Sequence, residues 1–255
     1  TRLTKSRPHI IIVATPPETH AEIVMEAADI PAVKAIVCEK PMALSVEAAE
    51  KMVARCQRKG KLLFVNHNRH FDPFHQKWST MWQTITGPPQ AAVFYYSRGL
   101  WNTGPHLLDL AFMYFGIPQW VTNELVFGVN EQLNPAFRIG FDDLVLHVVP
   151  YNEAGAYVFE LVIRGTQKNL VFCEGCNKLR LAQELVVVEE SDGDNLRNML
   201  RHVVSCIEGK DKPVSTGAEA VRAVQILEHL DNSEATCRRL CLKSVDLEKI
   251  EKSER

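Results

Sequence analysis

The first seventy residues alternate short apolar runs with segments whose apolar side chains recur every three or four positions. Residues 9–15 read HIIIVAT, a β-branched run typical of a strand that is buried on both faces of a parallel sheet. Residues 33–38 and 62–65 are further runs of this kind. Ser45 can cap one intervening helix, and helical spacing in the other relates His20, Ile23, Val24 and Ala27. This alternation predicts right-handed parallel crossovers and a doubly wound sheet.

After residue 70 the pattern changes. Phe74, Trp78 and Trp82 lie at helical spacing, and an apolar run at 91–97 predicts a strand. A second helix is predicted from about His106 to Phe115, because Gly116 occupies a position that commonly ends helices. Mostly antiparallel strands are then predicted at 121–129, 144–149, 157–164, 169–172 and 185–188.

Two helices are predicted near the C-terminus. The first carries an apolar face made of Leu196, Met199, Leu200, Val203, Val204 and Ile207. The second begins with a capping box, in which Thr216 is followed three residues later by Glu219. The charged tail after Leu247 is expected to be frayed or solvated. We therefore expect a parallel α/β piece over residues 1–70 and an α+β domain over residues 71–255.

The large sheet expected in the second domain has two faces to cover. Helices can cover one face, and the other must meet solvent or a partner. Homo-oligomerisation through this exposed sheet face is therefore expected.

Composition and charge exclude several classes of protein. The 29 basic and 31 acidic residues are mixed along the chain and give a net charge of −2, so we do not expect binding to nucleic acid. No apolar stretch approaches the roughly 20 residues of a membrane-spanning helix, and no signal-peptide core is present. A globular, cytoplasmic protein that does not bind membranes is expected.

The cysteines and histidines do not predict a metal site. Seven cysteines are an odd number, which favours reduced thiols over a disulfide framework. Cys173 and Cys176 have zinc-ligand spacing, but the other pair, Cys237 and Cys241, has a different spacing, so we interpret residues 173–176 as a turn between strands. His67, His70 and His75 lack ligand spacing on one defined face.

Several short motifs occur in a fixed order along the chain. Thr15-Pro16-Pro17 precedes His20, a strand ends at Cys38-Glu39-Lys40-Pro41, and another ends at Asn66-His67-Asn68-Arg69. Gly104-Pro105-His106-Leu107-Leu108-Asp109 follows. Together these motifs resemble the Gfo/Idh/MocA oxidoreductase family, and the resemblance covers essentially the whole chain. It implies that residues 1–70 are the C-terminal half of a Rossmann-type dinucleotide-binding domain and that residues 71–255 form a substrate-binding and oligomerisation domain.

The resemblance also implies hydride transfer between NAD or NADP and a secondary alcohol or ketone of a sugar-like substrate. Lys40 would lie at the carboxyl end of a parallel strand, where it can stabilise a developing alkoxide. Asn66 is a further candidate at this edge, for ribose, the nicotinamide amide or substrate. The cofactor side would comprise Thr15, Pro16, Pro17, His20, Glu39, Lys40 and Arg69.

His106 is the candidate general acid or base implied by the same resemblance. Because Pro105 suits a first helical turn, we expect the imidazole near a helix N-terminus, where protonation is disfavoured. Many relatives have Asp four residues earlier, where this chain has Asn102, which can orient a hydroxyl but not relay a proton. That Asn resembles a branch associated with nucleotide sugars and cell-envelope saccharides. Asp109 can bind a substrate hydroxyl, or its negative charge can simply complement the first turn of the helix. Trp101 can stack on a sugar or pack in the core.

The glycine turn that grips a dinucleotide is absent from the sequence. The first glycine is Gly60, and no Gly-x-Gly occurs. In the family frame the first strand, its glycine turn and the acidic residue for the ribose would precede Thr1, so we interpret the chain as a fragment and expect it alone to hold NAD weakly. The alternative is a non-enzymatic binding or oligomerisation homologue that has lost nucleotide binding.

Overall fold

The computed structural model describes residues 7–129, 132–151, 157–181, 187–232 and 239–242. The chain forms two compact units. Within the described residues, unit 1 comprises 7–71 and 195–228, and unit 2 comprises the residues from 72 to 194 and from 229 to 242. The sequence-based division instead assigned everything after residue 70 to one domain, so the two divisions differ over residues 195–228.

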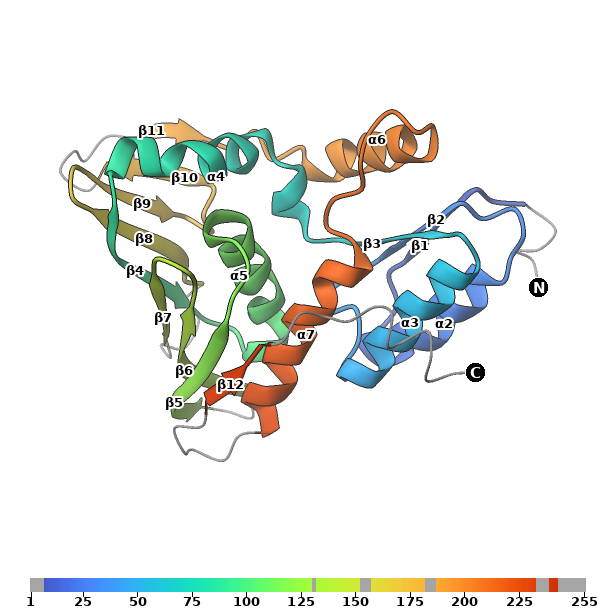
Figure 1. Cartoon of the computed structure of the whole chain (residues 1–255), viewed down its shortest axis with the longest axis horizontal. Coiled ribbons are helices and arrows are strands. Elements are labelled where there is room, and N and C mark those ends of the chain that lie inside the picture. Colours follow the sequence, from blue (N-terminus) through green and yellow to red (C-terminus); the bar gives the residue numbers. More distant parts are fainter. Residues whose placement is uncertain (1–6, 130–131, 152–156, 182–186, 233–238, 243–255) are drawn as a thin grey trace. The chain divides into compact units, whose positions relative to one another are not determined.

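Unit 1 is built on a 3-stranded parallel sheet in the order β1-β2-β3 (Figure 1). Its strands are β1 (Ile10–Val13), β2 (Ala35–Cys38) and β3 (Leu62–Val65), which lie within the three predicted runs. A short helix η1 (Pro17–Thr19) leads into α2 (His20–Ala28), and α3 (Val46–Arg58) connects β2 to β3. The Ser45 hydroxyl accepts a hydrogen bond of 3.2 Å from the Ala48 amide, so the predicted cap is confirmed.

Helices cover both faces of this parallel sheet. On one face, Ile36 and Leu63 pack with α2, α3 and the start of α7 (Gly217–Asn232). On the other face, Ala35, Val37 and Phe64 pack against α6 (Asn195–Ile207) through Met199 and Val203. Residues 195–228 therefore complete unit 1. Periodicity predicted the apolar stripes of these helices, but it cannot say which sheet a stripe covers.

The capping box predicted for α7 is present and anchors the helix beside β3. Glu219 accepts a hydrogen bond of 2.8 Å from the Thr216 amide, and its own amide donates to the Thr216 hydroxyl at 3.3 Å. Just before the cap, the Ser215 hydroxyl donates to the Val65 carbonyl at 2.8 Å, and the Val65 amide donates to the Ser215 carbonyl at the same distance. The start of α7 is thus fixed to the end of β3.

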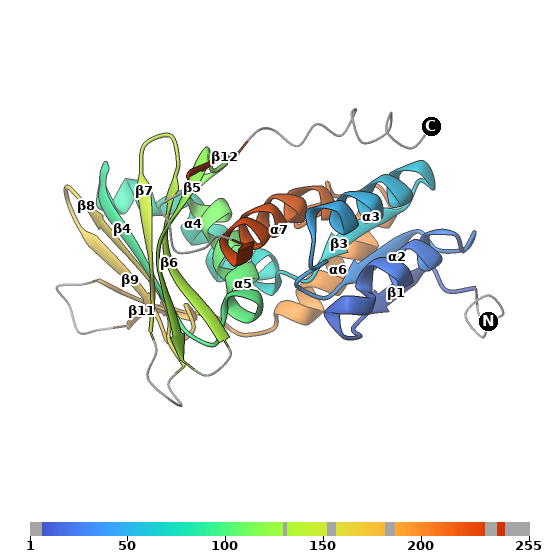
Figure 2. The same ribbon diagram turned by 90° about the horizontal axis from the view of Figure 1, so that it is seen from below.

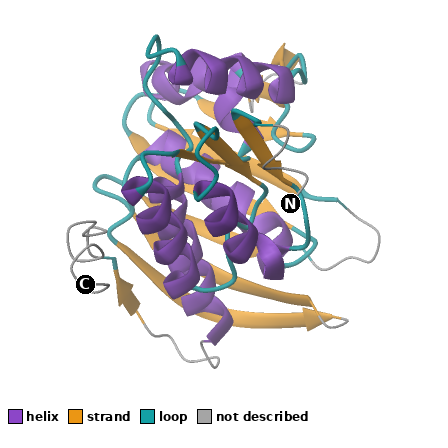
Figure 3. Ribbon diagram, turned by 90° about the vertical axis from the view of Figure 1, so that its right-hand side faces the viewer, coloured by secondary structure: helices purple, strands orange, loops and turns teal. Residues whose placement is uncertain are grey.

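Unit 2 is built on a 9-stranded sheet in the order β11-β10-β9-β8-β4-β7-β6-β5-β12 (Figure 2). β4 and β7 are parallel, and the other neighbouring strands are antiparallel, as predicted. The strands, orange in Figure 3, are β4 (Pro89–Tyr96), β5 (Trp120–Val129), β6 (Gln132–Gly140), β7 (Val145–Pro150), β8 (Phe159–Gly165), β9 (Asn169–Cys173), β10 (Lys178–Leu181), β11 (Val187–Glu190) and β12 (Arg239–Cys241).

The two faces of the large sheet differ in burial. Helix α4 (Pro73–Thr86) contacts β8 and β9, and α5 (Leu100–Phe115) contacts β4 and β6. Alternate side chains such as Phe94 and Leu161 are fully buried. Their neighbours Val93 and Val162 are half-buried, and Val149 is 38% exposed. The helix-covered face is therefore the core of unit 2.

Three strands and one helix boundary differ from the expectations. β6, β10 and β12 were not predicted; in β6, Pro135 lacks an amide hydrogen and interrupts the pattern of a central strand. Helix α5 begins at Leu100 rather than near His106, so Pro105 lies inside the helix. Gly116, at φ 87°, ends it as predicted.

The cysteine motif forms a tight turn between β9 and β10. Glu174, Gly175 and Cys176 have φ values of 52°, 77° and 62°, and the buried Cys176 thiol donates to the Phe159 carbonyl at 3.4 Å. Cys237 lies outside the described residues. Among the described side chains, no cluster of three or more His, Cys, Asp or Glu residues could hold a metal. In the same ranges, no helix is long and apolar enough to cross a membrane.

Candidate functional site

The Glu39-Lys40-Pro41 segment follows β2 at the carboxyl edge of the parallel sheet. The Glu39 amide donates to the Val13 carbonyl at 2.9 Å, and the Asn66 amide donates to the Cys38 carbonyl at 2.8 Å. The sheet ladder thus continues just beyond the ends of β1, β2 and β3. Ligands of open parallel sheets bind at this edge.

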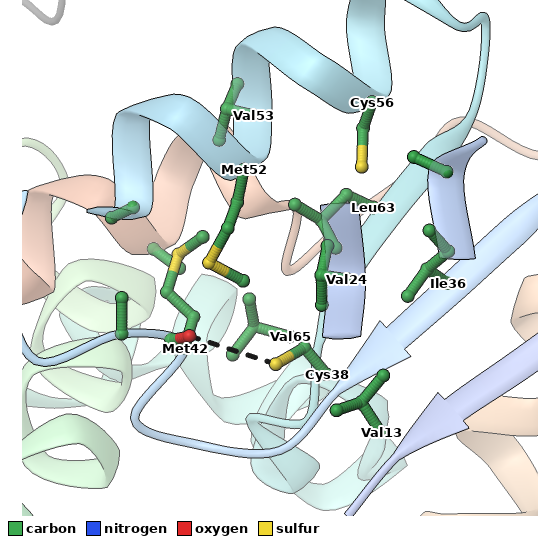
Figure 4. Packing of buried hydrophobic residues seen from close by; sticks show 14 of the residues in the cluster. Val13, Val24, Ile36, Cys38, Met42, Met52, Val53, Cys56, Leu63 and Val65 are labelled. Atoms are coloured by element: carbon green, nitrogen blue, oxygen red, sulfur yellow. Dashed lines mark hydrogen bonds between the residues drawn. The ribbon is translucent and has the colours of Figure 1, made fainter. Parts of the chain in front are cut away.

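The chain after Lys40 returns into the core of unit 1. The Lys40–Pro41 peptide bond is cis, and the next residues, Met42 and Ala43, are 1% and 2% exposed. Figure 4 shows Met42 near Met52, with the Cys38 thiol 3.9 Å from the Met42 carbonyl oxygen. This packing anchors the loop just beyond Lys40, which is itself half-buried.

Glu39 and Asn66 meet across the ends of neighbouring strands. The Asn66 side-chain amide donates a hydrogen bond of 2.5 Å to Glu39 Oε1. Asn66 Oδ1 is buried and has no hydrogen-bond partner among the described residues, and the same holds for Asn68 Oδ1. A buried acceptor without a donor is costly, so these oxygens suit a ligand that brings N–H or O–H groups. Asn68 was not singled out from the sequence, because its residue type alone carries no signal of burial.

The surroundings of Lys40 lower the pKa of its ammonium group. Desolvation lowers the pKa of the Lys40 ammonium, and the nearby Arg69 guanidinium lowers it further, whereas the Glu39 carboxylate opposes both effects. Arg69 is 9% exposed, so its charge lies close to the same protected edge. Lys40 is therefore better suited to exchange a proton than a lysine in open solvent.

His20 lies between the loops that follow β1 and β2. Its ring is 1% exposed, with Nδ1 2.9 Å from the Pro41 carbonyl oxygen and Nε2 2.8 Å from the Thr15 carbonyl oxygen. Both ring nitrogens thus face the protein backbone. Thr15 and Pro16 are exposed, and Pro17 is half-buried. The structure brings Thr15, His20 and Pro41 together, a contact that the sequence-based assignment of His20 to the cofactor did not anticipate.

The candidate residues of unit 2 lie on α5. Helical spacing puts Asn102, His106 and Asp109 along one face, and Trp101 is adjacent. Asn102 is exposed, His106 and Trp101 are half-buried, and Asp109 is 6% exposed. Because α5 begins at Leu100, His106 lies in the second turn, and the effect of the helix N-terminus fades within the first. The electrostatic argument made from Pro105 is therefore wrong.

The start of α5 is held by residues that the sequence did not single out. Gly99 precedes the helix with φ 89°, and its amide donates to Asn134 Oδ1 at 2.9 Å. The Thr103 hydroxyl lies 3.0 Å from the Gly99 carbonyl oxygen. Because Asn134 lies on β6, this link joins segments far apart in the sequence. No local pattern predicts it.

Comparisons with known proteins support the family resemblance of the first part of the chain. Residues 2–67 match the family model GFO_IDH_MocA, an oxidoreductase family with an NAD-binding Rossmann fold. The chain is 27% identical to the uncharacterized oxidoreductase YdgJ of Escherichia coli over 143 residues, covering 46% of this chain and 38% of YdgJ. It is 39% identical to inositol 2-dehydrogenase of Rubrobacter xylanophilus over 70 residues, covering 27% of this chain and 20% of that enzyme. The alignments thus span less than half of these relatives.

Solved structures share the architecture. Aldose-aldose oxidoreductase of Caulobacter crescentus, complexed with glycerol, superposes with a TM-score of 0.81 at 18% identity, covering 94% of this chain and 82% of that one. Levoglucosan dehydrogenase, complexed with NADH and levoglucosan, gives 0.79 at 18% identity, covering 96% and 82%. WlbA dehydrogenase of Bordetella pertussis, with NADH and UDP-GlcNAcA, gives 0.75 at 18% identity, covering 95% and 82%. The predicted fold, a Rossmann-type parallel sheet with a large, mostly antiparallel sheet, is confirmed.

Proposed function

We propose that the chain, whose residues 2–67 match the Gfo/Idh/MocA oxidoreductase family, serves hydride transfer between NAD or NADP and a sugar-like secondary alcohol or ketone. The observation that carries this proposal is the half-buried Lys40, whose pKa is lowered by desolvation at the carboxyl edge of a parallel sheet. A lysine in this position is suited to stabilise the negative charge that develops on the substrate oxygen during the reaction.

The residues at this edge fit the nicotinamide end of a dinucleotide. The unsatisfied Asn66 Oδ1 can accept a hydrogen bond from a carboxamide or a ribose hydroxyl, while the Asn66 amide is held by Glu39. When bound, the nicotinamide ring supplies the hydride or receives it. The sequence contains no Gly-x-Gly turn for the pyrophosphate, so we expect these 255 residues alone to bind the dinucleotide weakly.

In the oxidation direction, an alcohol loses a hydride from its carbon and a proton from its oxygen. We assign to Lys40 a hydrogen bond to that oxygen, which stabilises alkoxide character as the hydride leaves. His106 receives the proton through its imidazole, and the reverse transfers reduce a ketone. Asn102 orients a substrate hydroxyl, because an amide can donate and accept hydrogen bonds but cannot take a proton at neutral pH. Asp109 and Trp101 are the further substrate contacts that we propose on α5.

We propose a sugar or nucleotide sugar as the substrate. WlbA and levoglucosan dehydrogenase, which share the fold, are described with a nucleotide sugar and a sugar derivative respectively. The Asn at position 102 agrees with the nucleotide-sugar branch of the resemblance. We also propose a homo-oligomer that forms through the half-buried side chains of the large sheet, among them Val93, Val162 and the more exposed Val149.

Fluorescence titration with NADH and NADPH tests the proposal. Saturable binding, weakened by Asn66→Ala and unchanged by substitution of the exposed Asn177, supports a nicotinamide site at the β3 end. The protein as its gene encodes it is the appropriate sample. Absence of binding by that protein contradicts the enzymatic proposal.

The second candidate function is a binding or oligomerisation protein without redox activity. Asn102 in place of an acid and the lack of Gly-x-Gly favour it. The affinity for a sugar, measured with and without NADH, distinguishes the two functions. A non-enzymatic homologue that binds a sugar has the same affinity in both conditions.

A further inference from the structure

The environment of the His20 ring sets its hydrogen-bonding role. The ring is 1% exposed, and its Nδ1 and Nε2 atoms lie 2.9 and 2.8 Å from the carbonyl oxygens of Pro41 and Thr15. Carbonyl oxygens only accept hydrogen bonds, whereas a neutral imidazole donates from one nitrogen and accepts at the other. Both contacts can be hydrogen bonds only if each nitrogen carries a proton.

We propose that His20 is a positioning residue that donates from both ring nitrogens and thereby fastens the loop after β1 to the Lys40-Pro41 segment after β2. In this state the ring is an imidazolium. The role goes beyond cofactor contact, because His20 acts on Lys40 through the backbone.

Other orientations of the ring fit the two distances less well. A rotation of the ring by 180° would bring ring carbons toward the two oxygens, and C–H···O contacts are normally about 3.3–3.6 Å long. A neutral ring would place a nitrogen lone pair against a carbonyl oxygen in a buried site, which leaves two acceptors facing each other. Two donated hydrogen bonds satisfy every polar atom of the arrangement.

The helix N-terminus opposes this assignment, and the two carbonyl oxygens that face the ring nitrogens support it. His20 begins α2, and a helix start disfavours a cation. Hydrogen bonds from a charged donor are stronger than that effect. Burial also disfavours a charged ring, so the assignment rests on the two short contacts to carbonyl oxygens.

The location of the two acceptors explains the effect on Lys40. Pro41 directly follows Lys40, and Thr15 lies just beyond β1. The ladder bond from the Glu39 amide to the Val13 carbonyl ends before Lys40, and the buried Met42 holds the chain only after it. His20 therefore adds two contacts to the backbone between these anchors.

Nitrogen NMR of the unsubstituted protein tests the proton count directly. Two-bond proton–nitrogen correlation spectra at neutral pH, with His20 assigned by its loss in His20→Phe, are expected to show both nitrogens with the shifts of protonated imidazolium nitrogens. One protonated and one unprotonated nitrogen overturns the proposal. This measurement needs neither cofactor nor substrate, so its outcome is independent of the proposed function.

Hydrogen exchange measures the positioning. In His20→Phe, which keeps a planar ring without N–H groups, the amides of Lys40 and Met42 are expected to exchange on the order of ten-fold faster, since about 1 kcal/mol is lost with each hydrogen bond. His75→Phe, which removes a buried imidazole from unit 2, is the matched control and leaves these amides unchanged. Equal exchange in His20→Phe and in the unsubstituted protein contradicts the positioning role.

A kinetic readout connects His20 to the proposed function, on which this step rests. Misplacement of Lys40 lowers kcat by roughly ten-fold or more, while KM changes little because His20 does not contact the substrate. If hydrogen exchange is altered in His20→Phe but only KM changes, His20 stabilises the loop without positioning Lys40 for catalysis. That outcome contradicts the positioning role. Altered exchange in a protein without activity would instead overturn the enzymatic function and leave the hydrogen-bonding role of His20 intact.

Discussion

The two units present their candidate residues on different kinds of scaffold. In unit 1, Glu39, Lys40 and Asn66 lie in loops at the ends of short parallel strands, and the sheet ladder fixes where those loops begin. In unit 2, Asn102 and His106 lie along one helix, and a long-range hydrogen bond from Gly99 to Asn134 fixes where that helix begins. A strand end therefore predicts its site from local sequence, whereas a helix face depends on distant residues.

The largest expected effect is on turnover, and it compares Lys40 in the loop of unit 1 with Asn102 on the helix of unit 2. Lys40→Ala is expected to lower kcat by about 10²–10³-fold, because it removes a hydrogen bond that strengthens in the transition state. Asn102→Ala is expected to cost about ten-fold or less, since it removes only orientation of a hydroxyl. Steady-state turnover of the full-length protein with a sugar or nucleotide-sugar substrate measures both.

Lys34 offers a control for Lys40. It is an exposed lysine just before β2, at the opposite end of the same strand, and Lys34→Ala is expected to leave turnover unchanged. Equal losses in Lys40→Ala and Asn102→Ala would mean that the loop and the helix contribute alike, which would contradict the roles proposed here.

A second prediction concerns the assignment of α6 to unit 1. Val203 is 0% exposed and packs against Val37 and Phe64, whereas Val204 on the same helix is 44% exposed. Val203→Ala is expected to reduce the free energy of unfolding by about 1–3 kcal/mol through the lost contacts and the cavity. Val204→Ala is expected to change it by about 0.5 kcal/mol or less. Urea unfolding followed by fluorescence gives both values.

Hydrogen exchange then identifies the unit that is loosened. In Val203→Ala the amides of β2 and β3 should lose protection, while those of β4 and β8 should keep it. Loss of protection in β4 and β8 instead would mean that α6 stabilises the large sheet, as the sequence-based division assumed.

The smallest expected effect concerns the start of α5. Asn134→Ala leaves the buried Gly99 amide without its acceptor and should cost about 1–2 kcal/mol of unfolding free energy. Asn177→Ala, at an exposed position in the turn before β10, is the control and should be nearly neutral. If the two variants are equally stable, the link to Asn134 does not determine where α5 begins.

Much of unit 1 follows from the sequence because its determinants are local. Each of its three strands is a run of apolar residues, and Ser45 caps α3 through a residue three positions away. The partner of α6 could not be predicted, because a stripe such as Met199 and Val203 reports burial but not the surface that it meets. The same limit explains why residues 195–228 were assigned to the second domain.

The candidate site was predictable in its chemistry more than in its contacts. The order of the motifs pointed to Lys40 and His106 as chemical groups, and the structure adds the surroundings that lower the pKa of Lys40. The carbonyl partners of His20 could not be foreseen, since Pro41 lies 21 residues further along the chain, after helix α2 and strand β2. The same holds for the contact between Asn66 and Glu39.

The return of the chain to unit 1 has a consequence for biosynthesis. A ribosome completes β1, β2 and β3 long before it reaches α6, so the sheet face formed by Ala35, Val37 and Phe64 has no helix to cover it until β4 to β11 of the large sheet have been translated. The nascent chain therefore carries an apolar surface through most of its synthesis, a state that chaperones recognise. The described part of unit 1, although it begins first in the sequence, is complete only once residues 195–228 have been translated.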